Sequence, residues 1–133
     1  MKSKLGLICA IVAISLCLVA CSVAPNLVSV DASYSGQQVE VAVDGSVIVT
    51  LESNASTGFQ WVLVSIGDET VLEKVANTYE APEDTDMVGA PGKEIWTFKA
   101  LKKGTSTISM EYSQPWENGT QAAETFNLIV VVK

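Results

Sequence analysis

A succession of short runs, rich in β-branched and aromatic residues, constrains the fold more than any other feature; it begins near residue 27 and continues to the end of the chain. Residues 39–43 and 47–51 have the length and composition of β-strands. Asp44-Gly45 lies between them and is a dipeptide typical of tight hairpin turns. These two runs therefore predict a β-hairpin.

Further runs of the same kind predict strands at residues 59–63, 94–100, 105–112 and 125–132, the last of them central and well buried. Residues 71–75 fit a helical turn as well as a strand, so their pattern does not decide between the two. About eight short strands separated by turn residues predict an all-β domain, either an antiparallel sandwich or a barrel. The residues expected in its core include Trp61, Trp96, Ile108 and Met110, and those expected on a solvent-facing side are Glu94, Thr97 and Lys99.

Three segments between the strands have the composition of loops: residues 52–58, 81–93 and 113–121. The middle one is about 13 residues long, and connections of that length in a compact domain are often functional. Its acidic first half is equally compatible with a plain solvated connection.

The residue inventory excludes several kinds of chemistry. The chain has no histidine, and its three cysteines are Cys9, Cys17 and Cys21, all before the predicted domain. Nucleophile–histidine pairs and the usual zinc, copper or iron sites are therefore not expected, and no cofactor or metal is predicted. The net charge is −7 and the eight basic residues are all lysines, so a nucleic-acid-binding face is not expected either.

The N-terminal segment predicts export. Lys2 and Lys4 precede an apolar run of about 16 residues, which is shorter than the roughly 20 needed to span a bilayer. The run ends at Leu-Val-Ala-Cys21, which resembles the lipobox of prokaryotic lipoproteins. This resemblance implies a signal peptide at residues 1–20, a lipidated Cys21, a tether ending at residue 26, and a domain at residues 27–133 that is held on a membrane outside the cytoplasm.

The three loop segments carry motifs in a suggestive order. Residues 51–61 read Leu-Glu-Ser-Asn-Ala-Ser-Thr-Gly-Phe-Gln-Trp, residues 89–92 read Gly-Ala-Pro-Gly, and residues 112–116 read Tyr-Ser-Gln-Pro-Trp. These resemble the Asn-Pro-Thr-Thr-Gly-aromatic-x-Trp, Gly-x-Gly-Gly and Arg-Pro-Trp motifs of chagasin-family inhibitors of papain-like cysteine peptidases. The resemblance covers essentially the whole domain.

The resemblance implies an immunoglobulin-like antiparallel β-sandwich of about 7–8 strands with the three loops at one end. It implies a reversible competitive inhibitor, not an enzyme, in which the first loop enters the active-site cleft and the other two hold the rim. The residues expected to bind the peptidase are Asn54, Ala55, Ser56, Thr57, Gly58, Phe59, Gly89, Ala90, Pro91, Gly92, Gln114, Pro115 and Trp116. A monomer is expected, with a papain-like peptidase as its partner.

The motifs depart from the family pattern at three positions. Ala55 stands where the family has proline, Pro91 where it has glycine, and Gln114 where it has arginine. A different class of function also stays open, since an immunoglobulin-like surface module could bind carbohydrate or another protein through loop aromatics such as Trp116. The motif at residues 54–58 favours the inhibitor, because a sugar-binding module does not require it.

Overall fold

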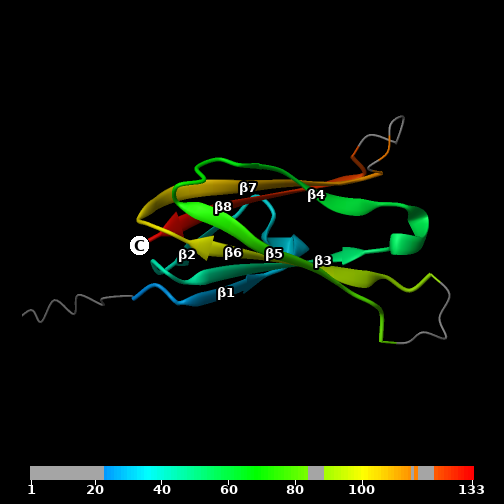
Figure 1. Ribbon diagram of the computed structural model, residues 1–133, viewed down its shortest axis with the longest axis horizontal. Coiled ribbons are helices and arrows are strands. Elements are labelled where there is room, and N and C mark those ends of the chain that lie inside the picture. Colours follow the sequence, from blue (N-terminus) through cyan, green and yellow to red (C-terminus); the bar gives the residue numbers. More distant parts are fainter. Residues whose placement is uncertain (1–22, 84–88, 115, 117–121) are drawn as a thin grey trace, which may run out of the picture.

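The computed structural model describes residues 23–83, 89–114, 116 and 122–133 and consists of eight strands in two packed sheets (Figure 1). The lipid-site prediction at Cys21 and the site prediction at Pro115 lie outside these residues. In the described part of the chain, no helix has the length and apolar character needed to cross a membrane. Every strand lies between Leu27 and Val132, so the segment from residue 23 onward contains the complete sandwich and its core.

The first sheet has the strand order β1-β3-β6-β5 and the second has the order β2-β8-β7-β4. The bounds of the strands in the first sheet are β1 Leu27–Val30, β3 Ser46–Ser53, β6 Gly92–Ala100 and β5 Leu72–Glu80. Those in the second are β2 Gln38–Val41, β8 Glu124–Val132, β7 Gly104–Ser113 and β4 Gln60–Ile66. Two short 3₁₀ turns, η1 at Ala32–Tyr34 and η2 at Ala55–Thr57, complete the fold.

The all-β sandwich is confirmed, but two of its strand pairings are parallel and not antiparallel as predicted. β1 pairs with β3 and β2 pairs with β8 in parallel, while the other four pairings are antiparallel. The chain leaves β1, crosses to the second sheet to form β2, and returns to the first sheet as β3 beside β1. These two crossings make β1 and β3 run in the same direction.

The predicted hairpin at Asp44-Gly45 is therefore wrong. The turn is present, with Asp44 at φ 66°, but it joins β2 in one sheet to β3 in the other. The ambiguous residues 71–75 lead into strand β5, and no helix forms there.

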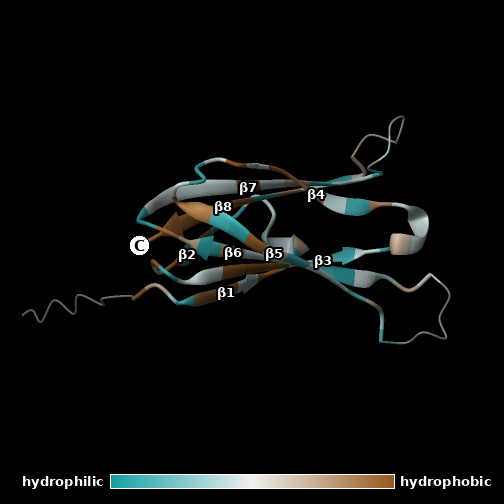
Figure 2. Ribbon diagram, viewed as in Figure 1, coloured by the Kyte–Doolittle hydropathy of each residue, from teal (hydrophilic) through white to brown (hydrophobic). Residues whose placement is uncertain are grey.

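The core lies between the sheets and is built from alternate residues of most strands, a pattern that Figure 2 shows as alternating hydropathy along the ribbons. β5 contributes only its first residue, Leu72. The predicted core residues Trp61, Trp96, Ile108 and Met110 are all buried, and β8 is an inner strand as expected. Because no disulfide joins the described residues, this core and the strand ladders hold the sandwich together.

Candidate functional site

The three loops predicted to be functional lie together at one end of the sandwich, on the right in Figure 1. They join β3 to β4, β5 to β6 and β7 to β8, and we call them the wedge loop (residues 54–59), the second loop (81–91) and the third loop (114–123). The first two loops are shorter than predicted, because Glu52, Ser53 and Lys93 belong to strands. The third loop begins one residue later than predicted, after Ser113, and ends two residues later, before β8.

The wedge loop is folded into a compact turn by its own side chains. Asn54 caps η2: its Oδ1 accepts hydrogen bonds from the Ser56 backbone N–H at 3.3 Å and from the Ser56 hydroxyl at 2.6 Å. The Thr57 hydroxyl donates to the Asn54 carbonyl at 2.7 Å. Ala55, Ser56 and Thr57 are exposed at the tip, with both hydroxyls donating within the loop. These bonds favour the folded conformation of the tip before any partner arrives.

Gly58 ends this turn in a conformation that favours glycine. Its φ is 78° and its backbone N–H donates to the Ala55 carbonyl at 3.2 Å. A Cβ atom at this position would lie 2.3 Å from Cη2 of Trp116. The glycine thus serves both the local turn and the contact with the third loop.

An aromatic cluster, formed by Phe59, Trp61 and Tyr112, supports the wedge loop from below. The Tyr112 ring lies 5.4 Å from that of Phe59 and 5.2 Å from that of Trp61, centroid to centroid. The Tyr112 hydroxyl accepts a hydrogen bond from the Asn54 N–H at 2.9 Å, and the Trp61 indole donates to the Glu52 carbonyl at 3.0 Å. Phe59, predicted to touch a partner, is half-buried on this cluster and supports the loop.

Glu94 is a site residue whose burial differs from the sequence prediction. It was expected on a solvent-facing side, yet only 6% of it is exposed, and its Oε2 accepts the Trp61 backbone N–H at 2.8 Å. The bond joins the two sheets directly below the wedge loop. The period of two in a strand contained the signal, since residues 94, 96 and 98 must share one face.

Among the residues that the structure describes, a hydrogen bond from Asn54 Nδ2 to the Gly89 carbonyl at 3.2 Å ties the second loop to the wedge loop. Gly89 has φ 85° and open space around its Cα, while Ala90 is half-buried and Pro91 is exposed. Gly92 does not lie in the loop as predicted, because it is the buried first residue of β6.

The small size of Gly92 serves the fold. A Cβ atom there would lie 2.4 Å from the Tyr79 hydroxyl and 2.5 Å from the Glu80 carbonyl, both on the neighbouring strand β5. The absence of a side chain lets the Tyr79 ring lie across the start of β6.

The third loop contributes Gln114, which is half-buried, and Trp116, which is 53% exposed. The six-membered ring of Trp116 lies against Gly58, as the position of its Cη2 atom shows. The tryptophan therefore neither folds back over the sandwich nor stands free. It links the third loop to the wedge loop and leaves about half of its surface exposed.

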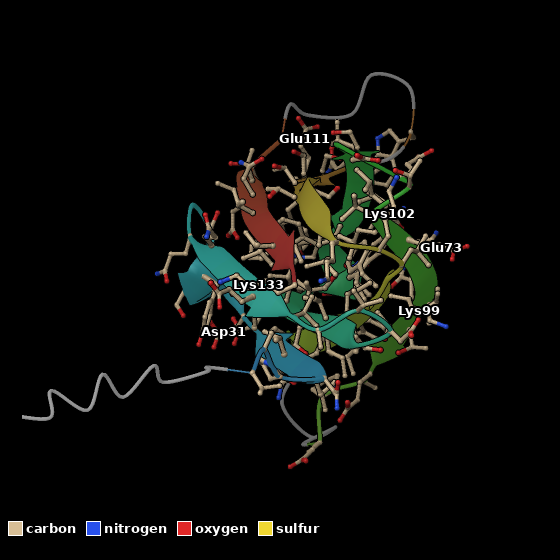
Figure 3. All side chains as sticks on the ribbon, turned by 90° about the vertical axis from the view of Figure 1, so that its left-hand side faces the viewer. Asp31, Glu73, Lys99, Lys102, Glu111 and Lys133 are labelled. Carbon is tan, nitrogen blue, oxygen red and sulfur yellow. The ribbon has the colours of Figure 1, made fainter. Side chains whose placement is uncertain are left out.

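The charges around the loops are mostly negative. Exposed carboxylates near this end are Asp31, Glu52, Glu80, Glu83, Glu111 and Glu124, and one exposed lysine, Lys93, lies just after the second loop, near the start of β6. Lys99, Lys102 and Lys133 lie toward the opposite end, which faces the viewer in Figure 3. Hydrogen bonds from the Ser33 side chain and backbone hold the pKa of Asp31 below its ordinary value.

The chain was compared with known families and curated proteins. The model of the chagasin family of peptidase inhibitors, I42, matches residues 40–130. Amoebiasin-2 of Entamoeba histolytica is 31% identical over 96 residues, which are 71% of this chain and 76% of that protein. Chagasin of Trypanosoma cruzi is 30% identical over 99 residues, which are 72% of this chain and 89% of chagasin.

Solved structures agree with this result. The crystal structure of the cysteine protease inhibitor EhICP2 from Entamoeba histolytica superposes with a TM-score of 0.72 at 25% identity, covering 80% of this chain and 96% of that one. PbICP-C, solved in complex with falcipain-2, shares the fold with a TM-score of 0.54 at 23% identity, covering 83% of this chain and 92% of that one. The chain therefore belongs to the chagasin family of peptidase inhibitors.

Proposed function

We propose that this protein inhibits papain-like cysteine peptidases reversibly and competitively by filling the active-site cleft with the wedge loop while the second and third loops hold its rim. The observation that carries the proposal is the linkage of the three loops. Asn54 bonds to Gly89 in the second loop, and Gly58 contacts Trp116 in the third. Family membership makes the protein an inhibitor and not an enzyme.

The linked loops limit the entropy lost on binding. A loop that is already held in its bound conformation loses less freedom when it enters a cleft than a mobile one does. The turn at Ala55–Thr57 is also compact and internally hydrogen-bonded. It does not offer an extended peptide to the catalytic thiol in the geometry that attack requires, so the inhibitor resists cleavage.

The loop residues divide into contacting and supporting groups under this proposal. Ala55, Ser56 and Thr57 form the tip that enters the cleft, with Thr57 nearest the catalytic thiol. Gly89, Ala90 and Pro91 form one flank, and Gln114, Pro115 and Trp116 form the other. Exposed tryptophans are enriched among the residues that dominate binding energy, so Trp116 is expected to be the main anchor. Asn54, Gly58, Phe59 and Gly92 hold this arrangement from within the protein.

Inhibition of papain by the segment 23–133, which contains the whole sandwich, tests the proposal. Thr57→Lys and Trp116→Ala are each expected to raise the inhibition constant at least about tenfold, equivalent to about 1.4 kcal/mol. Thr105→Lys places the same charge on an exposed position of β7, near the opposite end, and should leave inhibition unchanged. Failure to inhibit papain and several related peptidases at micromolar concentration would contradict the proposal.

We also propose that the protein is exported and anchored to the outer side of a cell membrane by a lipid on Cys21. Support comes from the Leu-Val-Ala-Cys21 sequence after an apolar run, and from a first strand that starts at Leu27, which leaves a short tether. Incorporation of labelled palmitate in a bacterial host tests it. Label should enter the wild-type protein and be lost in Cys21→Ala, whereas equal labelling of the variant would exclude this anchor.

A further inference from the structure

A hollow of about 490 Å³ lies beside the wedge loop, between the ends of strands β4 and β5. Its lining includes Ala55 and Phe59 of the wedge loop, Asn77 and Tyr79 of β5, Glu94 of β6, and Trp116 of the third loop. The hollow therefore adjoins the proposed peptidase-binding surface and shares Ala55 and Trp116 with it.

A buried carboxylate belongs to this hollow. Only 6% of Glu94 is exposed, and one of its carboxylate oxygens accepts a hydrogen bond from the Trp61 backbone N–H. Within the described residues, the ion pair that forms joins Lys133 to Glu40, and Glu94 takes no part in it. Lys74, on the neighbouring strand, lies over the Trp96 ring at 5.6 Å. A desolvated carboxylate is costly without a cationic partner, so the hollow favours a positive charge.

Aromatic side chains flank the same hollow. Tyr79 is directly opposite Glu94 in the pairing of β5 with β6, and 48% of it is exposed. Trp116 is 53% exposed, and Phe59 is half-buried. Aromatic faces attract ammonium and guanidinium groups, most strongly when water is excluded. A carboxylate together with such rings suits a long cationic side chain, whose stem packs on the rings while its head reaches the acid.

We propose that this hollow receives a lysine or arginine side chain from the cleft rim of the bound peptidase, and so selects targets that carry a cation there. The inference rests on the proposed function and adds a determinant of specificity to it. Glu94 supplies the charge, Tyr79 and Trp116 supply the rings, and the acidic surroundings favour approach of a positive surface.

Binding of a small probe tests the hollow on the free protein. N-acetyl-arginine methylamide is titrated into the labelled segment 23–133, and the indole N–H signals of Trp61 and Trp116 are followed by NMR. Saturable shifts are expected, and Glu94→Gln should weaken binding at least about tenfold while its amide oxygen still accepts the Trp61 N–H. Glu73→Gln, an exposed change on β5 remote from the loops, is the matched control.

Two results would overturn the inference at this stage: equal shifts with neutral N-acetyl-norleucine methylamide, or unchanged affinity in Glu94→Gln. Thermal melting checks that this variant folds. If it does not, Tyr79→Leu replaces it, because Tyr79 is half-exposed and its loss should weaken arginine binding several-fold.

Inhibition of papain supplies the second test. Each lysine and arginine on the papain cleft rim is replaced by methionine, and each variant is combined with Glu94→Gln in a double-mutant cycle. One rim cation should show a coupling of about tenfold, and tight inhibition without any coupled cation would overturn the inference. If papain is not inhibited at all, the proposed function fails, while the arginine probe still decides whether the hollow binds cations.

Discussion

The two ends of the sandwich are closed by different kinds of interaction. At the end opposite the loops, most links join backbone groups: Asp44 N–H to the Ala100 carbonyl at 2.9 Å, and Leu101 N–H to the Val71 carbonyl at 2.8 Å. A side chain takes part there as well, since the Ser106 hydroxyl bonds to the backbone of Asp68. At the loop end, side chains join one loop to another, as in the bond from Asn54 Nδ2 to Gly89 and the contact of Trp116 with Gly58.

This difference separates stability from binding. Backbone hydrogen bonds do not depend on which side chains are present, so the opposite end can fix the fold for many sequences. The side-chain links of the loop end depend on particular residues. Changes there are expected to alter the arrangement of the loops, and hence inhibition, more than they alter unfolding.

The largest effect on stability is expected at Gly45. A Cβ atom there would lie 2.6 Å from the Asn26 carbonyl and 2.8 Å from the Ala42 carbonyl. Gly45→Val should lower the free energy of unfolding by about 3 kcal/mol, measured by urea denaturation. The inhibition constant of the folded fraction should not change, and a large change in it would break the division between the two ends.

Gly58→Ala should instead weaken inhibition at least about tenfold, because the added methyl displaces Trp116 and strains the turn. Gly36→Ala is the matched control, since Gly36 has φ 82° with nothing within 4 Å of an added Cβ. Both variants should lose a similar stability of about 1–2 kcal/mol. Equal loss of inhibition in both would show that the contact with Trp116 has no role.

Tyr112→Phe removes the hydroxyl that accepts the Asn54 N–H. A partly buried donor left without its partner costs about 1 kcal/mol, so inhibition should fall about fivefold. Hydrogen exchange at the Asn54 amide should become faster. Tyr34→Phe, in η1, is the control and should change neither quantity.

Ala55→Pro should strengthen inhibition. Asn54 has φ −102° and ψ 93°, an extended conformation that suits a residue before proline, and the first residue of a 3₁₀ turn has a φ close to that of proline. A gain of about 0.4–1 kcal/mol in preorganisation corresponds to roughly two- to fivefold in affinity. No gain in a progress-curve assay would mean that the wedge loop is already fully held by Asn54.

The smallest effect is expected at Asp68, near the opposite end. A hydrogen bond from the Thr70 hydroxyl, and to a smaller extent one from its backbone N–H, holds the pKa of Asp68 below its ordinary value. A lowered pKa gives stability that is present above the unfolded value and lost as the pH falls through the folded one. Between about pH 5 and pH 3, the melting temperature of the wild type should therefore fall slightly more than that of Asp68→Asn. A steeper fall in the variant would contradict the sign.

Asp31 provides the counterpart nearer the loops, since Ser33 lowers its pKa in the same way. Asp31→Asn should show the same small reduction in acid sensitivity. A similar response at both positions would show that the two ends differ in how they are joined and not in how they respond to acid.

Much of the fold could be predicted from the sequence. The burial of Trp61 and Trp96 and the inner position of β8 follow from the alternation and composition of short runs, which are local properties. The loops could be located because turn-forming residues interrupt these runs. The motifs at residues 54–58 and 114–116 then pointed to the family, because the types and order of their residues can be read directly from the sequence.

Strand pairing and the supporting residues could not be predicted in this way. Asp44-Gly45 has the same local conformation whether it joins strands in one sheet or in two, and only the packing of both sheets placed β2 beside β8. The packing role of Gly92, which leaves room for Tyr79 on the neighbouring strand, was not visible in the sequence either.

The sequence by itself thus determined six of the strands, the positions of the loops and which residues are apolar enough to be buried, while β1 and β5 became clear only in the structure. Only the tertiary structure decided that Glu94 lies buried between the sheets, that Tyr112 holds Asn54, and that Gly58 contacts Trp116. The physical reason is the range of the forces involved. Backbone preference and hydrophobic periodicity act over a few neighbouring residues, whereas these three contacts join residues that only the packed sheets bring together.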